Sequence, residues 1–147
     1  METSLQQNYL DAFKGRFTSL MRWHHLDDFW NKLKLKVDDK WFIYHVGDTP
    51  PESPVDRKKL LEFIQEIDSL LREEHEEDYC GIVYADSKKE PGLIKIFDPN
   101  NLGVVCGFSD NPPLPGWVLS TIPPGGLEDL IPRPANRIRW WNKLWKK

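Results

Sequence analysis

The spacing of apolar residues predicts three helices in the first half of the chain. Apolar side chains recur at three- and four-residue steps over 4–21, over 26–36 and from Pro54 to about Glu74, which places them on one helical face in each stretch. The third stretch has the clearest amphipathic pattern in the chain, formed by Leu60, Phe63, Ile64, Ile67, Leu70 and Leu71. Ser53 before Pro54 is typical of an N-cap and a first helical turn, so we expect the third helix to begin there.

Short runs of apolar and β-branched residues predict the strands. The first is the aromatic run 41–46, and four more follow the third helix at 79–85, 93–97, 102–108 and 117–122. The connecting segments contain Asp, Asn, Pro and Gly, which are the residues that chain reversals need, so we expect antiparallel neighbours. The first strand could lie at an edge of the sheet or between other strands.

These elements predict one α+β domain spanning residues 1–147, with the order α-α-β-α-β-β-β-β-α. A mainly antiparallel sheet of four to five strands would pack against the helices, and a basic, Trp-rich helix would end the chain at about 134–147. A chain of 147 residues buries about two-thirds of its surface on folding, so its core needs no disulfide or metal.

Charge is distributed unevenly along the chain. Twenty basic residues stand against 23 acidic ones, a net charge of −3, which argues against a nucleic-acid-binding protein with a basic footprint. The segment 133–147 contains basic residues and no acid, whereas residues 1–132 carry 14 basic and 23 acidic side chains, a net charge of −9. The basic tail therefore either lies on the acidic body, for instance near 73–78, or meets an anionic partner.

The predicted C-terminal helix is amphipathic. On a helical wheel Trp140, Trp141 and Trp145 share one side, while Arg139 and Lys143 lie opposite. Three interpretations are open: a closing helix whose tryptophans pack on the sheet, a helix that fits a groove of a protein partner, and an interfacial helix that docks on a membrane surface.

A second candidate contact is the stiff loop before the last strand. Pro112, Pro113, Leu114, Pro115 and Trp117 combine restricted backbone freedom with apolar side chains. Loops presented by a rigid sheet often bind partners, and prolines lower the entropy lost on binding. The alternative is a loop that covers one end of the sheet.

Candidate catalytic groups are few. Cys80 and Cys106 lie in predicted strands, without the CxxC or clustered histidines of a metal site, so we predict no metal and no cofactor. His45 could meet either sulfur across the sheet, which would resemble a nucleophilic Cys/His pair.

No run is long enough for a membrane span, and the N-terminus lacks the pattern of a secretion signal, so we expect a cytoplasmic protein. Our first hypothesis is a small non-enzymatic binding or accessory protein that acts through protein–protein contacts. The alternatives are a peripheral membrane protein held by the tail and an enzyme with a Cys/His site.

Overall fold

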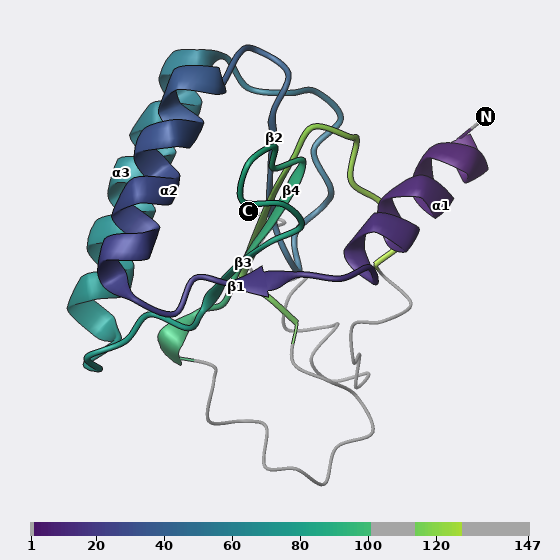
Figure 1. The fold of residues 1–147 in the computed structure, drawn as a ribbon. Coiled ribbons are helices and arrows are strands. Elements are labelled where there is room, and N and C mark those ends of the chain that lie inside the picture. Colours follow the sequence, from purple (N-terminus) through teal and green to yellow (C-terminus); the bar gives the residue numbers. More distant parts are fainter. Residues whose placement is uncertain (1, 101–113, 128–147) are drawn as a thin grey trace, which may run out of the picture.

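The computed structural model describes residues 2–100 and 114–127 (Figure 1). Within these residues, three helices and five strands form an α+β fold, the fold class that the sequence predicts. The elements follow the order α1 (Glu2–Phe13), β1 (Thr18–Ser19), α2 (Trp23–Lys36), β2 (Phe42–His45), α3 (Arg57–Glu74), β3 (Val83–Ala85), β4 (Leu93–Ile96) and β5 (Trp117–Ser120).

The strands form one antiparallel sheet in the order β1-β3-β4-β5-β2. The first predicted strand, now β2, therefore lies at an edge, and β4 lies at the centre. The register aligns Tyr84, Lys95, Val118 and Tyr44 in one row across β3, β4, β5 and β2. Because side chains alternate between the faces of a sheet, this whole row points to one face.

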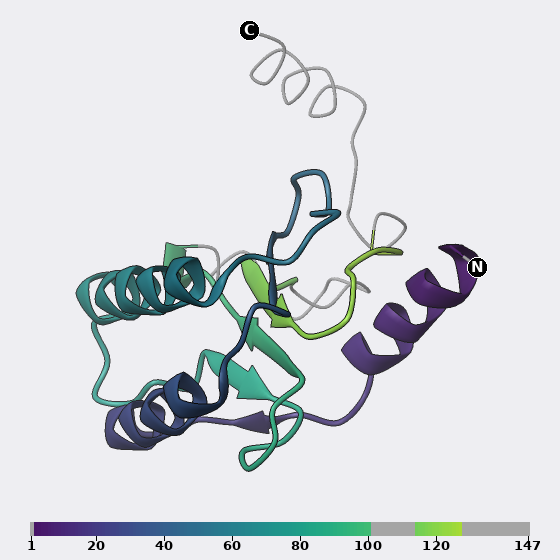
Figure 2. The ribbon, with the colours of Figure 1, turned by 90° about the horizontal axis from the view of Figure 1, so that it is seen from above.

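The helices cover opposite faces of the sheet. Figure 2 shows α2 and α3 side by side on one face and α1 on the other. The larger core lies under α2 and α3, whose buried side chains pack against Val83, Ile94, Ile96 and Leu119 of the sheet. The buried helical residues confirm the predicted apolar faces: Leu26, Phe29, Trp30 and Leu33 on α2, and Leu60, Ile64, Ile67 and Leu71 on α3. Each fully buried side chain of this size stabilises the fold by about 1.5–3 kcal/mol.

A smaller core lies between α1 and the other face. Tyr9 and Phe13 of α1 pack with Tyr44, Leu93 and Val118 of the sheet, and Leu127 closes the cluster. The Tyr9 hydroxyl is buried and makes no hydrogen bond to any described residue. Burial, and secondarily the neighbouring Tyr44, raises the pKa of Tyr9, so this hydroxyl stays protonated.

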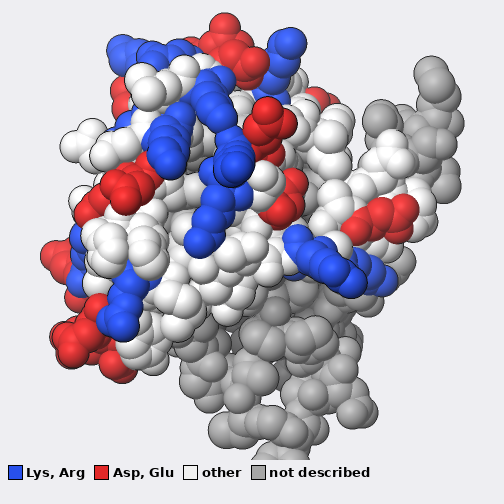
Figure 3. Space-filling view, in the orientation of Figure 1, with Lys and Arg blue, Asp and Glu red and all other residues white. Residues whose placement is uncertain are grey.

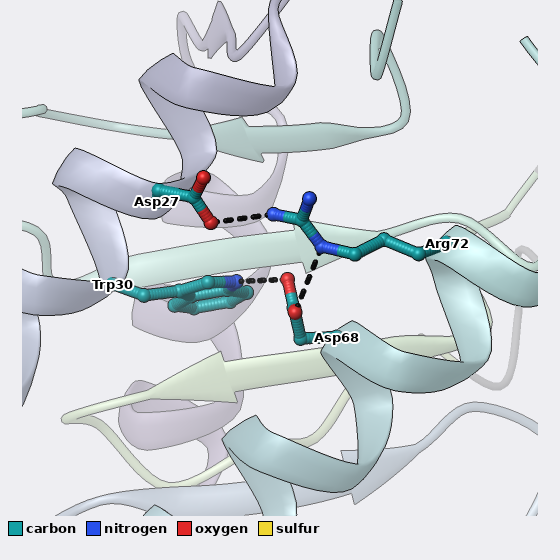
Figure 4. A network of polar contacts seen from close by, with 4 residues as sticks. All are labelled: Asp27, Trp30, Asp68 and Arg72. Carbon is teal, nitrogen blue, oxygen red and sulfur yellow. Dashed lines mark hydrogen bonds and ion pairs between the residues drawn. The ribbon is translucent and has the colours of Figure 1, made fainter.

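A polar network joins α2 to α3 (Figure 4). The indole N–H of Trp30 donates to Asp68 Oδ1 at 3.2 Å, and Arg72 Nε donates to Asp68 Oδ2 at 2.9 Å. A second nitrogen of Arg72 reaches Asp27 on α2 at 2.5 Å. Asp68 therefore satisfies a buried donor from α2 while it orients Arg72 toward the same helix.

The predicted helix over 4–21 is wrong beyond Phe13. The Lys14 and Gly15 N–H groups close the helix by donating to Leu10 and Ala12 carbonyls. Thr18 and Ser19 then pair with β3 as an additional edge strand. The apolar spacing continued past Phe13, but pairing with β3 supplied the backbone hydrogen bonds of this segment instead.

The predicted start of the third helix is also wrong. The Val55 N–H donates to the Trp41 carbonyl at 2.8 Å, so Ser53 and Pro54 precede the helix. Asp56 is the N-cap, and its side chain accepts from the Lys59 N–H at 2.8 Å.

The predicted strand 79–85 is shorter in the structure. It forms only at Val83–Ala85, because Cys80 and Gly81 donate to the carbonyls of Met21 and Leu20. The predicted strand 102–108 and the C-terminal helix at 134–147 lie outside the described residues.

Candidate functional site

Two exposed apolar side chains lie near one glycine where the segment before α2 passes the segment before β3. Among the described residues, the exposed large hydrophobic side chains are Met21, Leu35 and Tyr79, at 50, 86 and 44% exposure. Met21 and Tyr79 flank Gly81, since a Cβ built there would lie 3.2 Å from Tyr79 Cδ2 and 3.7 Å from Met21 Sδ. Leu35 lies apart from them near the end of α2.

The backbone holds this pair of side chains in place. The Cys80 N–H donates to the Met21 carbonyl at 2.7 Å, and the Gly81 N–H donates to the Leu20 carbonyl at 3.0 Å. Gly81 has a φ of +67°, a conformation that glycine adopts without strain. Met21 and Tyr79 are therefore presented by a hydrogen-bonded junction rather than by a free loop.

Trp23 extends the apolar surface toward α3. Its ring is partly exposed, and its indole N–H donates to the Glu77 carbonyl at 3.0 Å. The Arg72 guanidinium lies 4.9 Å from the ring centroid, in cation–π range. His75 lies edge-on to both Trp23 and Tyr79, with ring centroids 6.1 and 5.9 Å away.

His75 is fixed by the backbone beside it. Its Nε2 lies 2.9 Å from the Cys80 carbonyl oxygen, and a carbonyl only accepts, so Nε2 is assigned as the donor. This contact ties the end of α3 to the segment that carries Tyr79. We name the surface formed by Met21, Trp23, Arg72, His75 and residues 76–79 the acidic corner.

The acidic corner is hollowed and carries net negative charge. Trp23, Arg72, His75, Glu76, Glu77 and Asp78 line a hollow of about 380 Å³. Glu76, Glu77 and Asp78 make no ion pair with any described residue, whereas Arg72 is already paired with Asp27 and Asp68. Figure 3 shows acidic side chains gathered at the lower left, where α3 ends, and basic ones mainly higher on this face.

An acidic groove continues along α3. It measures about 430 Å³ and is lined by Glu62, Gln65, Glu66, Ser69, Leu70, Glu73 and Glu74. No basic residue is among these, so the negative potential extends from the acidic corner over the exposed side of the helix. This charge distribution attracts cations and repels anionic ligands.

The structure does not bring His45 and Cys80 together. His45 is exposed on the edge strand β2, stacked on Trp117 at 5.7 Å and 2.9 Å from Asp48. Cys80 is buried just before β3, three strands away in the sheet, and burial is the main cause that raises the pKa of its thiol. Raising the pKa lowers the thiolate fraction, so this thiol is a poor nucleophile. Cys106 lies outside the described residues.

The described part of the predicted proline loop packs on the body. Leu114 contacts the smaller core, Pro115 is buried, and Trp117 is partly buried beside His45. The other residues predicted to bind a partner lie outside the described residues: Pro112, Pro113, Arg139, Trp140, Trp141, Lys143 and Trp145.

Sequence reasoning missed the acidic corner. It considered 73–78 only as an acidic stretch on which the basic tail could lie, and it placed Met21 inside the predicted helix over 4–21. One feature of the sequence could have indicated this site, because Tyr79 is a large aromatic residue directly after an acidic run. Its neighbour in space, Met21, is distant in sequence, so no local pattern connects the two residues.

Within the part of the chain that the structure describes, no cluster of His, Cys, Asp and Glu could hold a metal ion. None of the described helices is long and apolar enough to cross a membrane. Comparison of the chain with protein-family models, with curated proteins and with solved structures finds no match.

Proposed function

We propose that this protein is a non-enzymatic binding protein that recognises a basic, partly apolar segment of a partner protein at the acidic corner. The observation that carries this proposal is the exposure of Met21 and Tyr79 on either side of Gly81, next to acidic side chains that make no ion pair with any described residue. A cytoplasmic location remains a prediction that accompanies it.

The apolar residues would supply most of the affinity. Tyr79, Trp23 and Arg72 belong to the residue types that dominate binding energy at protein interfaces. Covering an exposed Met or Tyr contributes up to about 1.5–3 kcal/mol when the side chain becomes fully buried. Because the Cys80 and Gly81 backbone hydrogen bonds already order this surface, binding costs less conformational entropy there.

The acidic residues would select the partner. Glu76, Glu77 and Asp78 line the same hollow as Trp23. The α3 groove adds four more carboxylates, at Glu62, Glu66, Glu73 and Glu74. Such a field speeds the approach of a basic segment and disfavours an acidic one. The partner class is therefore a protein segment with basic and apolar side chains on one surface.

A titration of the full chain tests this proposal. The probe is a fluorescein-labelled synthetic peptide with lysines on one helical face and leucines on the other, and its anisotropy reports binding. We expect Tyr79→Ala to weaken binding about tenfold or more, equivalent to about 1.4 kcal/mol. Leu35→Ala is the matched control, because Leu35 is the more exposed hydrophobic residue and lies elsewhere.

The charge contribution has its own control. A double variant with Glu76→Gln and Glu77→Gln should bind the peptide more weakly, and its binding should depend less on salt concentration. The control is a double variant with Glu52→Gln and Glu90→Gln, which changes two exposed glutamates elsewhere and should leave binding unchanged. Equal losses for Tyr79→Ala and Leu35→Ala, or no binding of the peptide by the intact chain, would reject the acidic corner as the binding surface.

A further inference from the structure

Lys95 occupies an unusual position at the centre of the sheet. It lies on β4, between Tyr84 of β3 and Val118 of β5, on the face that α1 covers. Its Nζ is 4.1 Å from the ring centroid of Phe13 and 4.0 Å from that of Phe17. Figure 2 shows α1 over this face, away from α2 and α3.

This amine lacks an acidic partner in the described part of the chain. No ion pair or hydrogen bond to its Nζ occurs there. The titratable side chains on this face are tyrosines in the described residues: Tyr84 opposite on β3, Tyr44 farther along the same row on β2, and Tyr9 on α1. The aromatic rings nearest the amine belong to Phe13 and Phe17. The ring faces attract an ammonium by about 0.5–1 kcal/mol each, which is less than a buried charge loses on desolvation.

Burial therefore acts on Lys95 without an opposing carboxylate. It lowers the pKa of Lys95 to about 8. At about pH 7.4 such an amine is about one-fifth neutral, whereas an ordinary lysine is about one-thousandth neutral, a difference of about 200-fold. The side chain is nonetheless partly exposed, as is Phe17, so small molecules can reach it.

We propose that Lys95 is a covalent binding site for a small apolar aldehyde, which its amine captures as a Schiff base between the rings of Phe13 and Phe17. The neutral nitrogen attacks the carbonyl carbon, and the carbonyl π electrons move to oxygen. A proton passes from nitrogen to that oxygen, which gives a carbinolamine. Loss of one water molecule then forms the C=N bond, so the step is reversible and needs no oxidant or reductant.

The surroundings favour an uncharged aldehyde. The two phenyl rings offer apolar contact to a short alkyl chain, and no basic residue contacts Lys95 in the described structure to hold a carboxylate. This site is separate from the acidic corner, because Lys95 faces α1 and the acidic corner lies at the α2 and α3 layer.

Reductive trapping of the full chain tests the proposal. Propanal and sodium cyanoborohydride are added for a short time at about pH 7.4, and peptide mass spectrometry reports the modification of each lysine. We expect Lys95 to react at least about tenfold faster than Lys58 and Lys59, which are exposed at the start of α3. A rate at Lys95 equal to or below theirs would overturn the proposal, whether the cause is a protonated or an inaccessible amine.

The pH profile separates this mechanism from simple exposure. Between about pH 7.4 and 9, the rate at Lys95 should rise only about fivefold, because most of the amine becomes neutral, while ordinary lysines gain about fortyfold. Phe17→Ala should reduce the preference for Lys95, because it uncovers the amine; circular dichroism confirms that this variant is folded. Parallel pH profiles, or a preference that Phe17→Ala leaves unchanged, would refute an amine activated by this environment.

Discussion

Replacing Asp68 by alanine should destabilise the fold through Trp30. Trp30 is only 3% exposed, and its indole N–H donates to Asp68 alone among the described residues. Leaving a buried donor without a partner costs about 1–3 kcal/mol. Losing the partly exposed contact with Arg72 adds about 0.2–1 kcal/mol, and Arg72 keeps Asp27. We expect a loss of about 2 kcal/mol in the free energy of unfolding.

Urea unfolding followed by circular dichroism measures this loss, and a double-mutant cycle assigns it. In a Trp30→Phe background there is no indole N–H to leave unpaired, so Asp68→Ala should cost about 1 kcal/mol less than in the natural chain. Asp27→Ala is the control, because Asp27 is 56% exposed and its pair with Arg72 should contribute less than about 1 kcal/mol. The same cost of Asp68→Ala in both backgrounds, or a cost below about 0.5 kcal/mol, would show that this bond does not stabilise the fold.

Three further substitutions probe other sites, each by urea unfolding. Tyr9→Phe removes a buried hydroxyl without a hydrogen bond to any described residue, so stability should stay equal or rise by up to about 1 kcal/mol; a clear loss would contradict this. Lys95→Met should stabilise the protein at pH 7. The folded-state pKa of Lys95 is about 8, so between about pH 8 and 10 the unfolded chain binds more protons than the folded one. The natural chain therefore gains stability as the pH rises through this range, and the stability advantage of Lys95→Met should shrink. A stability advantage that does not depend on pH would disprove this cause. Gly81→Ala should cost about 1–2 kcal/mol because of its φ of +67°, and a neutral result would argue against that conformation.

Periodicity alone predicted much of the architecture. The spacing of apolar residues along each segment predicted the buried faces of α2 and α3 and the positions of β2, β4 and β5. The antiparallel pairing of β3 with β4 was also predicted, from the turn residues in the connection at 86–92. These features are local, because a helix or strand buries its apolar residues according to its own repeat.

Contacts between distant segments decided what the sequence could not. Apolar spacing extended the first helix through Thr18 and Ser19, yet these residues gain backbone hydrogen bonds from β3 instead. The same junction brings Met21 beside Tyr79, so the acidic corner exists only once β1 and β3 have paired. Lys95 follows the alternation expected of a solvent-facing strand position, and only the packing of Phe13 and Phe17 over β4 buries its amine. The repeat of apolar side chains is a property of each segment by itself. Strand order and burial depend instead on which distant segments pack together, so only the tertiary structure determines them.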